Sequence, residues 1–378
     1  MGNGTVDVVV VGLGFGGSFP AIYLDHPQVG RVAVCERDPK RLAAITERHE
    51  FANVFADLDE VLASDYDAVH LVSGIPDHAR QAVAVLEAGK HCACTVPMAT
   101  SLDDLRAIVA AQRQAGRHYM MMETAVYTRQ FLYARELAQQ GRFGRLQFLR
   151  GAHYQDMERW PEYWAGLPPM WYATHAVAPL LALAGTRAVS VRALGSGVMR
   201  EDLRQRYGNP FPVETAIFEL DAPQLCAEVT RTLFHCARPY MESFVIYGEN
   251  SCYEWQMENE DPVLFEASPV VPGEVRQFTT SRPAPPDRQE LLPPEIARHT
   301  TRFKATSSHT HLSFEQGGGH HGSHPHLVHE FVSAVSEDRP PAIDAVTAAN
   351  WTAAGICAHE SASQGGAVVA IPAFDRER

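Results

Sequence analysis

Two side chains that can carry protons, Tyr172 and His175, lie three positions apart in this sequence. They fall at the start of an apolar stretch, Trp171 to Leu183, that predicts a helix. Residues three apart on a helix share one face, so both rings could act on one small molecule. A phenol and an imidazole in a pocket of low dielectric can take and return protons. The alternative is structural: a buried tyrosine with a satisfied hydroxyl and a core histidine bonded to the backbone.

A glycine-rich turn follows the apolar run Val8 to Val11 near the start of the chain. Gly12 and Gly14 would let the backbone turn tightly and approach phosphates, and Gly17 would let the next helix pack close to the strand. The N-terminus of that helix presents free N–H donors and a positive dipole end. The pattern predicts a strand, turn and helix that bind the pyrophosphate of a dinucleotide.

An acidic residue supplies the second half of this fingerprint. Glu36 ends the next apolar strand, Arg31 to Cys35, at the spacing where a carboxylate accepts hydrogen bonds from the adenosine ribose. A carboxylate would repel a ribose phosphate, so Glu36 favours NAD over NADP. Arg37, the next residue, keeps NADP open as the alternative.

Composition sets the class of protein. A chain of 378 residues is long for one core and suggests two domains. A net charge of −13 argues against nucleic acid and anionic membranes as partners. The seven cysteines are scattered and odd in number, which favours reduced residues in a cytoplasmic protein. We expect neither a membrane span nor a signal peptide.

The order of expected elements predicts an α/β protein in two parts. Strands and helices alternate to about residue 123, as in a Rossmann fold with a doubly wound parallel sheet, so we assign residues 1–124 to an NAD-binding domain. From about residue 145 strands follow one another without intervening helices. Residues 125–378 therefore predict an α+β domain for substrate binding and oligomerisation, with a large, mostly antiparallel open sheet. The stretch 262–300 predicts a long excursion or lid.

These features resemble the Gfo/Idh/MocA family of sugar oxidoreductases over nearly the whole chain. The resemblance rests on the dinucleotide fold, the segment Glu87 to His91 that leads into a strand ending in proline, and the C-terminal open sheet. Members usually carry Glu-Lys-Pro after that strand, where the lysine helps to deprotonate a sugar hydroxyl, and an aspartate four residues before a histidine. Here the tripeptide is Thr95-Val96-Pro97, and Trp171 lies four residues before His175. Both departures remove a charge from the expected centre.

A narrower resemblance is to the NAD-dependent α-N-acetylgalactosaminidase branch of this superfamily. It rests on Tyr172 to His175, Val96-Pro97, Met121 to Glu123 and Arg238-Pro239-Tyr240. The branch is implied to cleave glycosides without net redox change. Its members oxidise the hydroxyl on sugar carbon 3, expel the anomeric group by elimination, add water and reduce the ketone. The functional residues of the branch correspond to Tyr154, Tyr172 and His175.

The resemblance also implies contacts with cofactor and substrate. The expected cofactor contacts, besides the three glycines and Glu36, are Phe15, Arg37, Ser73, His78, Thr95, Val96 and Pro97. For His78 a capping or packing role is the alternative. The expected substrate contacts are Glu123, Trp171, His320 and His321. Glu123 could equally be a solvated strand residue.

Histidines also crowd the C-terminal part, at His309, His311 and between Gly317 and His329. Such crowding suggests a metal, but neither a cysteine nor a carboxylate completes a recognisable ligand set. We therefore expect no metal and interpret the stretch as a loop over the sugar pocket, from which one or two histidines reach hydroxyls.

The sequence thus predicts an NAD-dependent enzyme that moves a hydride at ring carbon 3 of a sugar or glycoside, within a redox-neutral cleavage. One alternative is a net NAD-dependent sugar dehydrogenase. Another is a noncatalytic sugar or nucleotide sensor, suggested by the missing lysine and aspartate. The expected partners are a small-molecule sugar and, because the sheet is open-faced, further copies of the chain.

Overall fold

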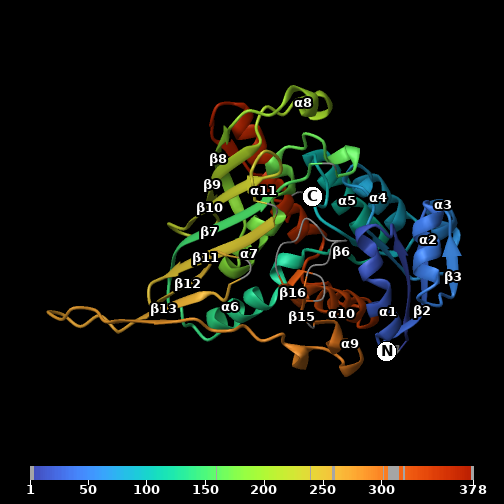
Figure 1. Ribbon diagram of the computed structural model, residues 1–378, viewed down its shortest axis with the longest axis horizontal. Coiled ribbons are helices and arrows are strands. Elements are labelled where there is room, and N and C mark those ends of the chain that lie inside the picture. The colour runs from blue at the N-terminus through green and yellow to red at the C-terminus, as the bar shows by residue number, and fades with distance from the viewer. Residues whose placement is uncertain are drawn as a thin grey trace.

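The computed structural model describes residues 4–158, 160–238, 240–257, 260–300, 302–304, 315–317 and 320–375. It contains two large β-sheets that lie beside each other, with helices between and around them (Figure 1). None of the helices in these ranges is long and apolar enough to cross a membrane.

The N-terminal sheet is parallel, with the strand order β3-β2-β1-β4-β5-β6. Its strands are β1 (Val6–Val11), β2 (Val29–Cys35), β3 (Asn53–Phe55), β4 (Ala68–Leu71), β5 (His91–Cys94) and β6 (Tyr119–Met121). The helices between them are α1 (Pro20–Asp25), α2 (Pro39–Thr46), α3 (Leu58–Ala63), α4 (His78–Glu87) and α5 (Leu102–Ala115). The strand order reverses between β1 and β4, and doubly wound sheets bind ligands at the carboxyl ends of such strands. The predicted Rossmann sheet is confirmed.

Local sequence explains the form of these elements. Val8, Val9 and Val10 are fully buried, because a parallel strand covered on both faces needs an unbroken apolar run. Helix α2 begins where the Asp38 side chain accepts a hydrogen bond from the Lys40 N–H at 2.9 Å. This cap fixes where α2 starts relative to the carboxyl edge of the sheet.

The second sheet is mostly antiparallel, as predicted, with the order β14-β13-β12-β11-β7-β10-β9-β8-β17. At its centre β7 and β10 pair in parallel. Its strands are β7 (Leu146–Gln155), β8 (Ala188–Ser196), β9 (Val213–Leu220), β10 (Cys226–Thr232), β11 (Tyr240–Gly248), β12 (Ser251–Trp255), β13 (Val263–Ala267), β14 (Phe278–Ser281) and β17 (Val369–Ala370). The other helices and strands are α6 (Arg129–Gln139), α7 (Thr174–Ala184), α8 (Glu201–Tyr207), α9 (Pro294–Ala297), α10 (Ser323–Ser336), α11 (Ala345–Ser363), β15 (Arg302–Lys304) and β16 (Glu315–Gly317).

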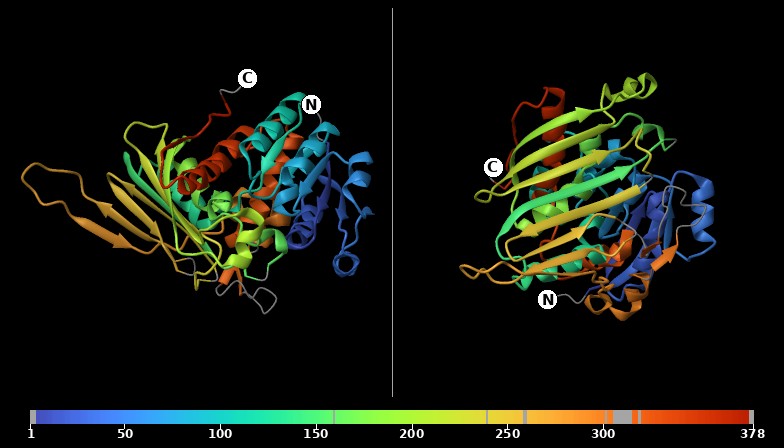
Figure 2. Two further views of the ribbon diagram at one scale, coloured as in Figure 1. Left: turned by 90° about the horizontal axis from the view of Figure 1, so that it is seen from above. Right: turned by 60° about the vertical axis from the view of Figure 1, so that its left-hand side comes forward.

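Helices cover one face of this sheet. Helices α7 and α11 pack on the inner face, and Figure 2 shows the other face open toward the viewer in its right-hand view. Part of the expected excursion forms strands β13 and β14, whose connection projects away from the body of the molecule (Figure 1).

The last helices return to the N-terminal sheet. Helix α11 packs against α5 and β6, and the Met121 N–H donates to the Ile343 carbonyl oxygen at 3.1 Å. The carboxyl edge of the first sheet therefore faces both α7 and α10. The boundary between residues 124 and 125 stays a prediction.

Candidate functional site

A cleft of about 1190 Å³ runs along the carboxyl edge of the first sheet and ends against the second sheet. At one end lie Gly12, Gly14 and Gly17, which expose backbone instead of side chains. Gly12 has a φ of +88°, and a Cβ there would lie 2.6 Å from the Val72 carbonyl oxygen, so the turn requires glycine.

The close packing expected of Gly17 belongs instead to its neighbour Gly16. A Cβ at Gly16 would lie 2.9 Å from the Cβ of Val72, whereas one at Gly17 would meet nothing within 4 Å. The turn continues as a 3₁₀ segment, Phe15–Ser18, before α1 begins, and this rotates Gly16 toward the sheet. Phe15 lines the cleft, and its contact with the cofactor stays a prediction.

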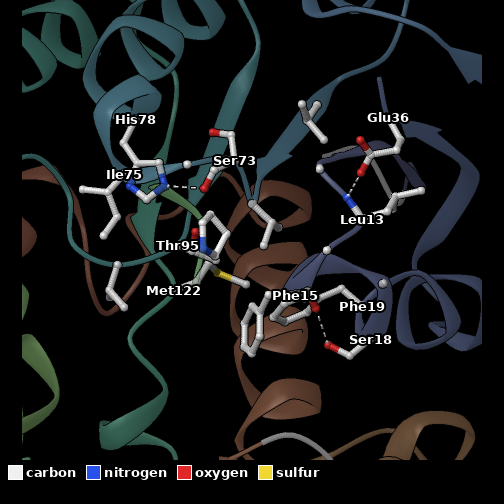
Figure 3. A pocket seen from close by; sticks show the side chains of 18 of the residues that line it. Leu13, Phe15, Ser18, Phe19, Glu36, Ser73, Ile75, His78, Thr95 and Met122 are labelled. Carbon is white, nitrogen blue, oxygen red and sulfur yellow. Dashed lines mark hydrogen bonds between the residues drawn. The ribbon is translucent and has the colours of Figure 1, made fainter. Parts of the chain in front are cut away.

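Glu36 lies beside the glycine turn. Its Oε2 accepts from the Leu13 N–H at 2.7 Å, which Figure 3 shows, and its Oε1 accepts from the Asp38 N–H at 3.0 Å. The carboxylate thus lines the cleft at the end of β2, where an adenosine ribose would meet it. Arg37 and Arg41 line the same end.

The ends of β4 and β5 form the middle of the cleft. Ser73, His78, Thr95 and Val96 line it, and Figure 3 shows the first three together with Met122. His78 is buried, and its ring nitrogens lie 2.8 Å from the Pro97 carbonyl oxygen and 3.1 Å from that of Ser73. His78 therefore ties β4 to β5 through the backbone, which is the packing role left open above. Pro97 contributes this carbonyl from behind the lining.

At the far end Tyr172 and His175 meet. The Tyr172 hydroxyl lies 3.3 Å from His175 Nε2, and both residues line the cleft. The expected single helix is interrupted at Ala173: Tyr172 ends a 3₁₀ segment, Pro169–Tyr172, and His175 is the second residue of α7. The two rings still share one face.

Glu123 completes a chain of hydrogen bonds. Its Oε1 lies 2.5 Å from His175 Nδ1 and also accepts from the Ala125 N–H at 2.9 Å. This differs from the expected substrate contact, because Glu123 is fully buried behind His175 and does not line the cleft. Glu123 lies two residues after the end of β6, at the carboxyl end of a parallel strand, and this position is the sequence signal that could have indicated its role.

The electrostatic surroundings of Tyr172, His175 and Glu123 suit proton transfer. Burial by itself lowers the pKa of His175, but the Glu123 carboxylate outweighs it and raises that pKa above 6.5. Burial also raises the pKa of Tyr172 above its usual value of 10.0. With Nδ1–H held by Glu123, the free lone pair on Nε2 faces the Tyr172 hydroxyl and can accept its proton.

A second polar cluster, formed by His320, Tyr240 and Glu242, lies beside the His175 ring. His320 Nδ1 is 2.9 Å from the Tyr240 hydroxyl, which donates a short hydrogen bond to Glu242. Burial alone raises the pKa of Glu242, yet His320 and His175 lower it to about 2. His320 and Tyr240 line the cleft, and the substrate contact of His320 stays a prediction.

His153 is a site residue that sequence reasoning missed. It is fully buried, it lines the cleft, and neither ring nitrogen has a hydrogen-bond partner among the described residues. Burial holds its pKa well below 6.5, so the ring is neutral. Its ring centroid lies 4.9 Å from that of His175 and 5.2 Å from that of Tyr240.

Besides Glu123 and Pro97, three further expected site residues are not brought into the cleft. Tyr154 alternates with His153 and Gln155 along β7; these two line the cleft, and Tyr154 lies on the opposite face of the sheet. Trp171 packs against the rings of Tyr207 and His359 instead.

His321 is the third. It is buried against Trp255, with ring centroids 5.4 Å apart, and does not line the cleft. The predictions for His309 and His311, and the motif residue Pro239, lie outside the described residues. Within the described ranges, no three histidine, cysteine or acidic side chains are arranged to hold a metal ion.

Residues 6–123 match the model of an oxidoreductase family with an NAD-binding Rossmann fold, GFO_IDH_MocA. Glycosyl hydrolase family 109 protein 1 of Bacteroides fragilis is 29% identical over 194 residues, which are 46% of this chain and 42% of that protein's length. Residues 6–123 are thus similar to the NAD-binding domain of the Gfo/Idh/MocA oxidoreductase family.

Two further proteins are similar to this chain over nearly its whole length. A glycosyl hydrolase family 109 protein of Saccharopolyspora erythraea is 22% identical over 99% of this chain and 84% of its own length. The fold matches levoglucosan dehydrogenase, solved with NADH and L-sorbose, with a TM-score of 0.76 at 20% identity over 98% of this chain and 99% of that one. The chain covers less than half the length of the B. fragilis relative.

The family whose model residues 6–123 match binds NAD. The residues present fit it. The side-chain-free turn at Gly12, Gly14 and Gly17 leaves backbone accessible to phosphates, and the buried Glu36 carboxylate lies where ribose hydroxyls would donate.

Proposed function

We propose that the protein moves a hydride at ring carbon 3 of a sugar within a redox-neutral cleavage of a glycoside. The observation that carries the proposal is the buried Glu123–His175–Tyr172 chain, which opens on the same cleft as the NAD cradle. Val96 supports it, because the family resemblance implies that net dehydrogenases carry a lysine at this position. A proton carrier other than lysine is therefore needed.

The polar groups left over in the cleft support a polyhydroxylated ligand. Both ring nitrogens of His153, the indole N–H of Trp164 and the hydroxyl of Thr124 are buried without a partner among the described residues. All three residues line the cleft. Buried polar groups are rarely left unpaired, and a sugar offers both donors and acceptors to such a set.

The side chains of Tyr172, His175 and Glu123 carry the first proton transfer. When bound, NAD accepts a hydride from carbon 3 and later returns it. Tyr172 takes the proton of the carbon 3 hydroxyl and passes its own proton to His175 Nε2, while Glu123 stabilises the imidazolium that forms. The ketone acidifies the proton on carbon 2, and the neutral His153 ring in the cleft accepts that proton as the anomeric group leaves and a double bond forms between carbons 1 and 2. Addition of water puts a hydroxyl on carbon 1 and a proton back on carbon 2, and return of the hydride to carbon 3 restores the sugar.

We also propose that the protein is a homo-oligomer that associates through the open face of the second sheet. Leu194 on β8 and Ile217 on β9 are 60% and 45% exposed there, and Val368 beside them is 58% exposed. An apolar surface on an open sheet favours a second copy. Light scattering should give a mass above that of one chain, and Ile217→Lys should reduce it.

The test of the catalytic proposal records two signals at once. The purified protein is incubated with a panel of nitrophenyl glycosides, and phenol release is followed together with NADH absorbance. We expect phenol release with catalytic amounts of NAD, no accumulation of NADH, and exchange of the carbon 2 proton for deuterium in heavy water. Tyr172→Phe is the matched inactive control.

One NADH per substrate with an intact glycosidic bond would instead establish a net sugar dehydrogenase. Binding of sugar and NAD with neither signal, for every glycoside and free sugar tried, would favour the noncatalytic sensor.

A further inference from the structure

A buried arginine holds together three residues of the cleft. Arg231 on β10 is fully buried, and its Nε donates to the Tyr172 carbonyl oxygen at 2.8 Å. Its Nη1 donates to the His153 carbonyl oxygen at 2.9 Å, and its Nη2 donates to the Gln155 side chain at 3.1 Å. One guanidinium thus links the 3₁₀ segment that carries Tyr172 to the strand that carries His153.

The charge of Arg231 is not neutralised by direct contact. Over the described ranges, no Asp or Glu oxygen lies within 4.0 Å of its nitrogens, and its hydrogen bonds go to neutral oxygens. Burial lowers its pKa to about 10, which still leaves it charged at neutral pH. A buried cation is costly. Arg231 donates to four oxygens, including the Thr232 carbonyl, which is more than the two N–H groups of a neutral amide could serve.

The cation lies next to the reacting groups. The guanidinium carbon is 5.2 Å from the centroid of the Tyr172 ring. Its positive charge opposes the negative charge of two buried carboxylates, Glu123 and Glu242. Any negative charge that develops on the Tyr172 oxygen during proton transfer would be stabilised by this cation, because the surroundings have a low dielectric constant.

We infer that Arg231 is a positioning residue that also tunes proton transfer, by holding Tyr172 and His153 in place and by opposing the negative charge of Glu123 and Glu242. It does not line the cleft and acts through Tyr172 and His175. The inference deepens the proposed function and rests on the assignment of Tyr172 and His175 to proton transfer.

The sign of the electrostatic effect follows from the groups around His175. The titratable and charged residues that face it from the surrounding elements are Glu123, Tyr172, His153, Arg231, Glu242 and His320. The two carboxylates favour the imidazolium, and Arg231 disfavours it. Removing the cation should therefore raise the pKa of His175.

The test measures this titration directly. Histidine labelled with ¹⁵N is introduced into the NAD-bound protein, the His175 signal is assigned with His175→Gln, and its titration is followed by NMR in the wild type, Arg231→Lys and Arg231→Met. We expect His175 to titrate at higher pH in Arg231→Met and close to the wild-type pH in Arg231→Lys. If Arg231→Met does not fold, Arg231→Gln removes the charge while keeping N–H donors, and the same criterion applies.

Kinetics supply the second readout. In Arg231→Met, kcat should fall by about a hundredfold, on the scale of losing one preorganised electrostatic group, with KM little changed and the acid limb of the pH profile shifted to higher pH. Arg150→Met is the matched control, since Arg150 is 52% exposed on the outer face of β7 and pairs with Glu228. It should behave as the wild type.

An unchanged His175 titration in the charge-removing variants would overturn the inference. The NMR measurement needs no turnover, so it decides the role of Arg231 even if the glycoside assay fails. The rate comparison uses whichever activity, glycoside cleavage or NADH formation, the wild type shows.

Discussion

Replacing Glu123 by glutamine tests the hydrogen-bond chain at its buried end. Glu123→Gln keeps the size of the side chain but exchanges a carboxylate for an amide, 2.5 Å from His175 Nδ1. If the amide donates to Nδ1, the ring proton moves to Nε2, and Nε2 can no longer accept a proton from the Tyr172 hydroxyl 3.3 Å away.

The expected loss in rate is large. A positioned base contributes about 10²–10⁴-fold, and a histidine held in the wrong tautomer loses most of that contribution, so kcat should fall by at least about a hundredfold. NAD affinity should stay unchanged, because Glu123 does not line the cleft.

The direction in which the pH profile of the rate shifts provides an independent test. In the wild type Glu123 raises the pKa of His175 above 6.5, so activity that needs the neutral ring should appear only as the pH rises through that raised pKa. In Glu123→Gln the carboxylate no longer opposes burial, which lowers the pKa of His175, so the acid limb of the remaining activity should move to lower pH. The stability that the ion pair contributes is complete below pH 6.5 and is lost as the pH rises through the raised pKa.

The assay is initial rate against pH on the best substrate found, with NAD affinity measured by fluorescence titration. Glu214→Gln is the control, because Glu214 is an equally buried glutamate paired with His359 at 2.6 Å but lies outside the cleft. Near wild-type kcat in Glu123→Gln, or equal losses in both variants, would refute the proton-relay argument.

Further predictions follow from the same geometry. Tyr172→Phe should lower kcat by about a hundredfold or more, whereas Tyr154→Phe, on the other face of the sheet, should stay near wild type; similar losses in steady-state kinetics would contradict this. Glu36→Ala should narrow a preference for NAD(H) over NADP(H), and a wild type that binds NADP(H) as tightly would disprove the assignment. Gly12→Ala should weaken NAD binding, because its Cβ would lie 2.6 Å from the Val72 carbonyl oxygen; unchanged calorimetric affinity would count against the turn geometry. Burial lowers the pKa values of His26, His70 and His91 to about 4, about 3 and about 4. These rings must charge on acidification, so the urea midpoint should fall as the pH drops from about 6.5 toward 4, and His70→Gln should reduce that dependence.

Short-range features were determined by the sequence itself. The valine run, the glycine turn and Glu36 lie within about thirty residues of one another, and the caps at Asp38 and Ser101 act on N–H groups two or three residues away. Such signals need no tertiary contact, because the local backbone geometry alone selects the residue types. They suffice for the parallel sheet and for the position of the NAD cradle.

The catalytic contacts were decided by tertiary structure. Glu123 reaches His175 across 52 positions, and nothing in the spacing of the two indicates it. Along β7, side chains point to alternate faces, so a single position separates His153 in the cleft from Tyr154 outside it. The two residues are neighbours in the sequence. Only the pairing of β7 with its neighbours and the packing of α7 on one face decide which of the two rings lines the cleft.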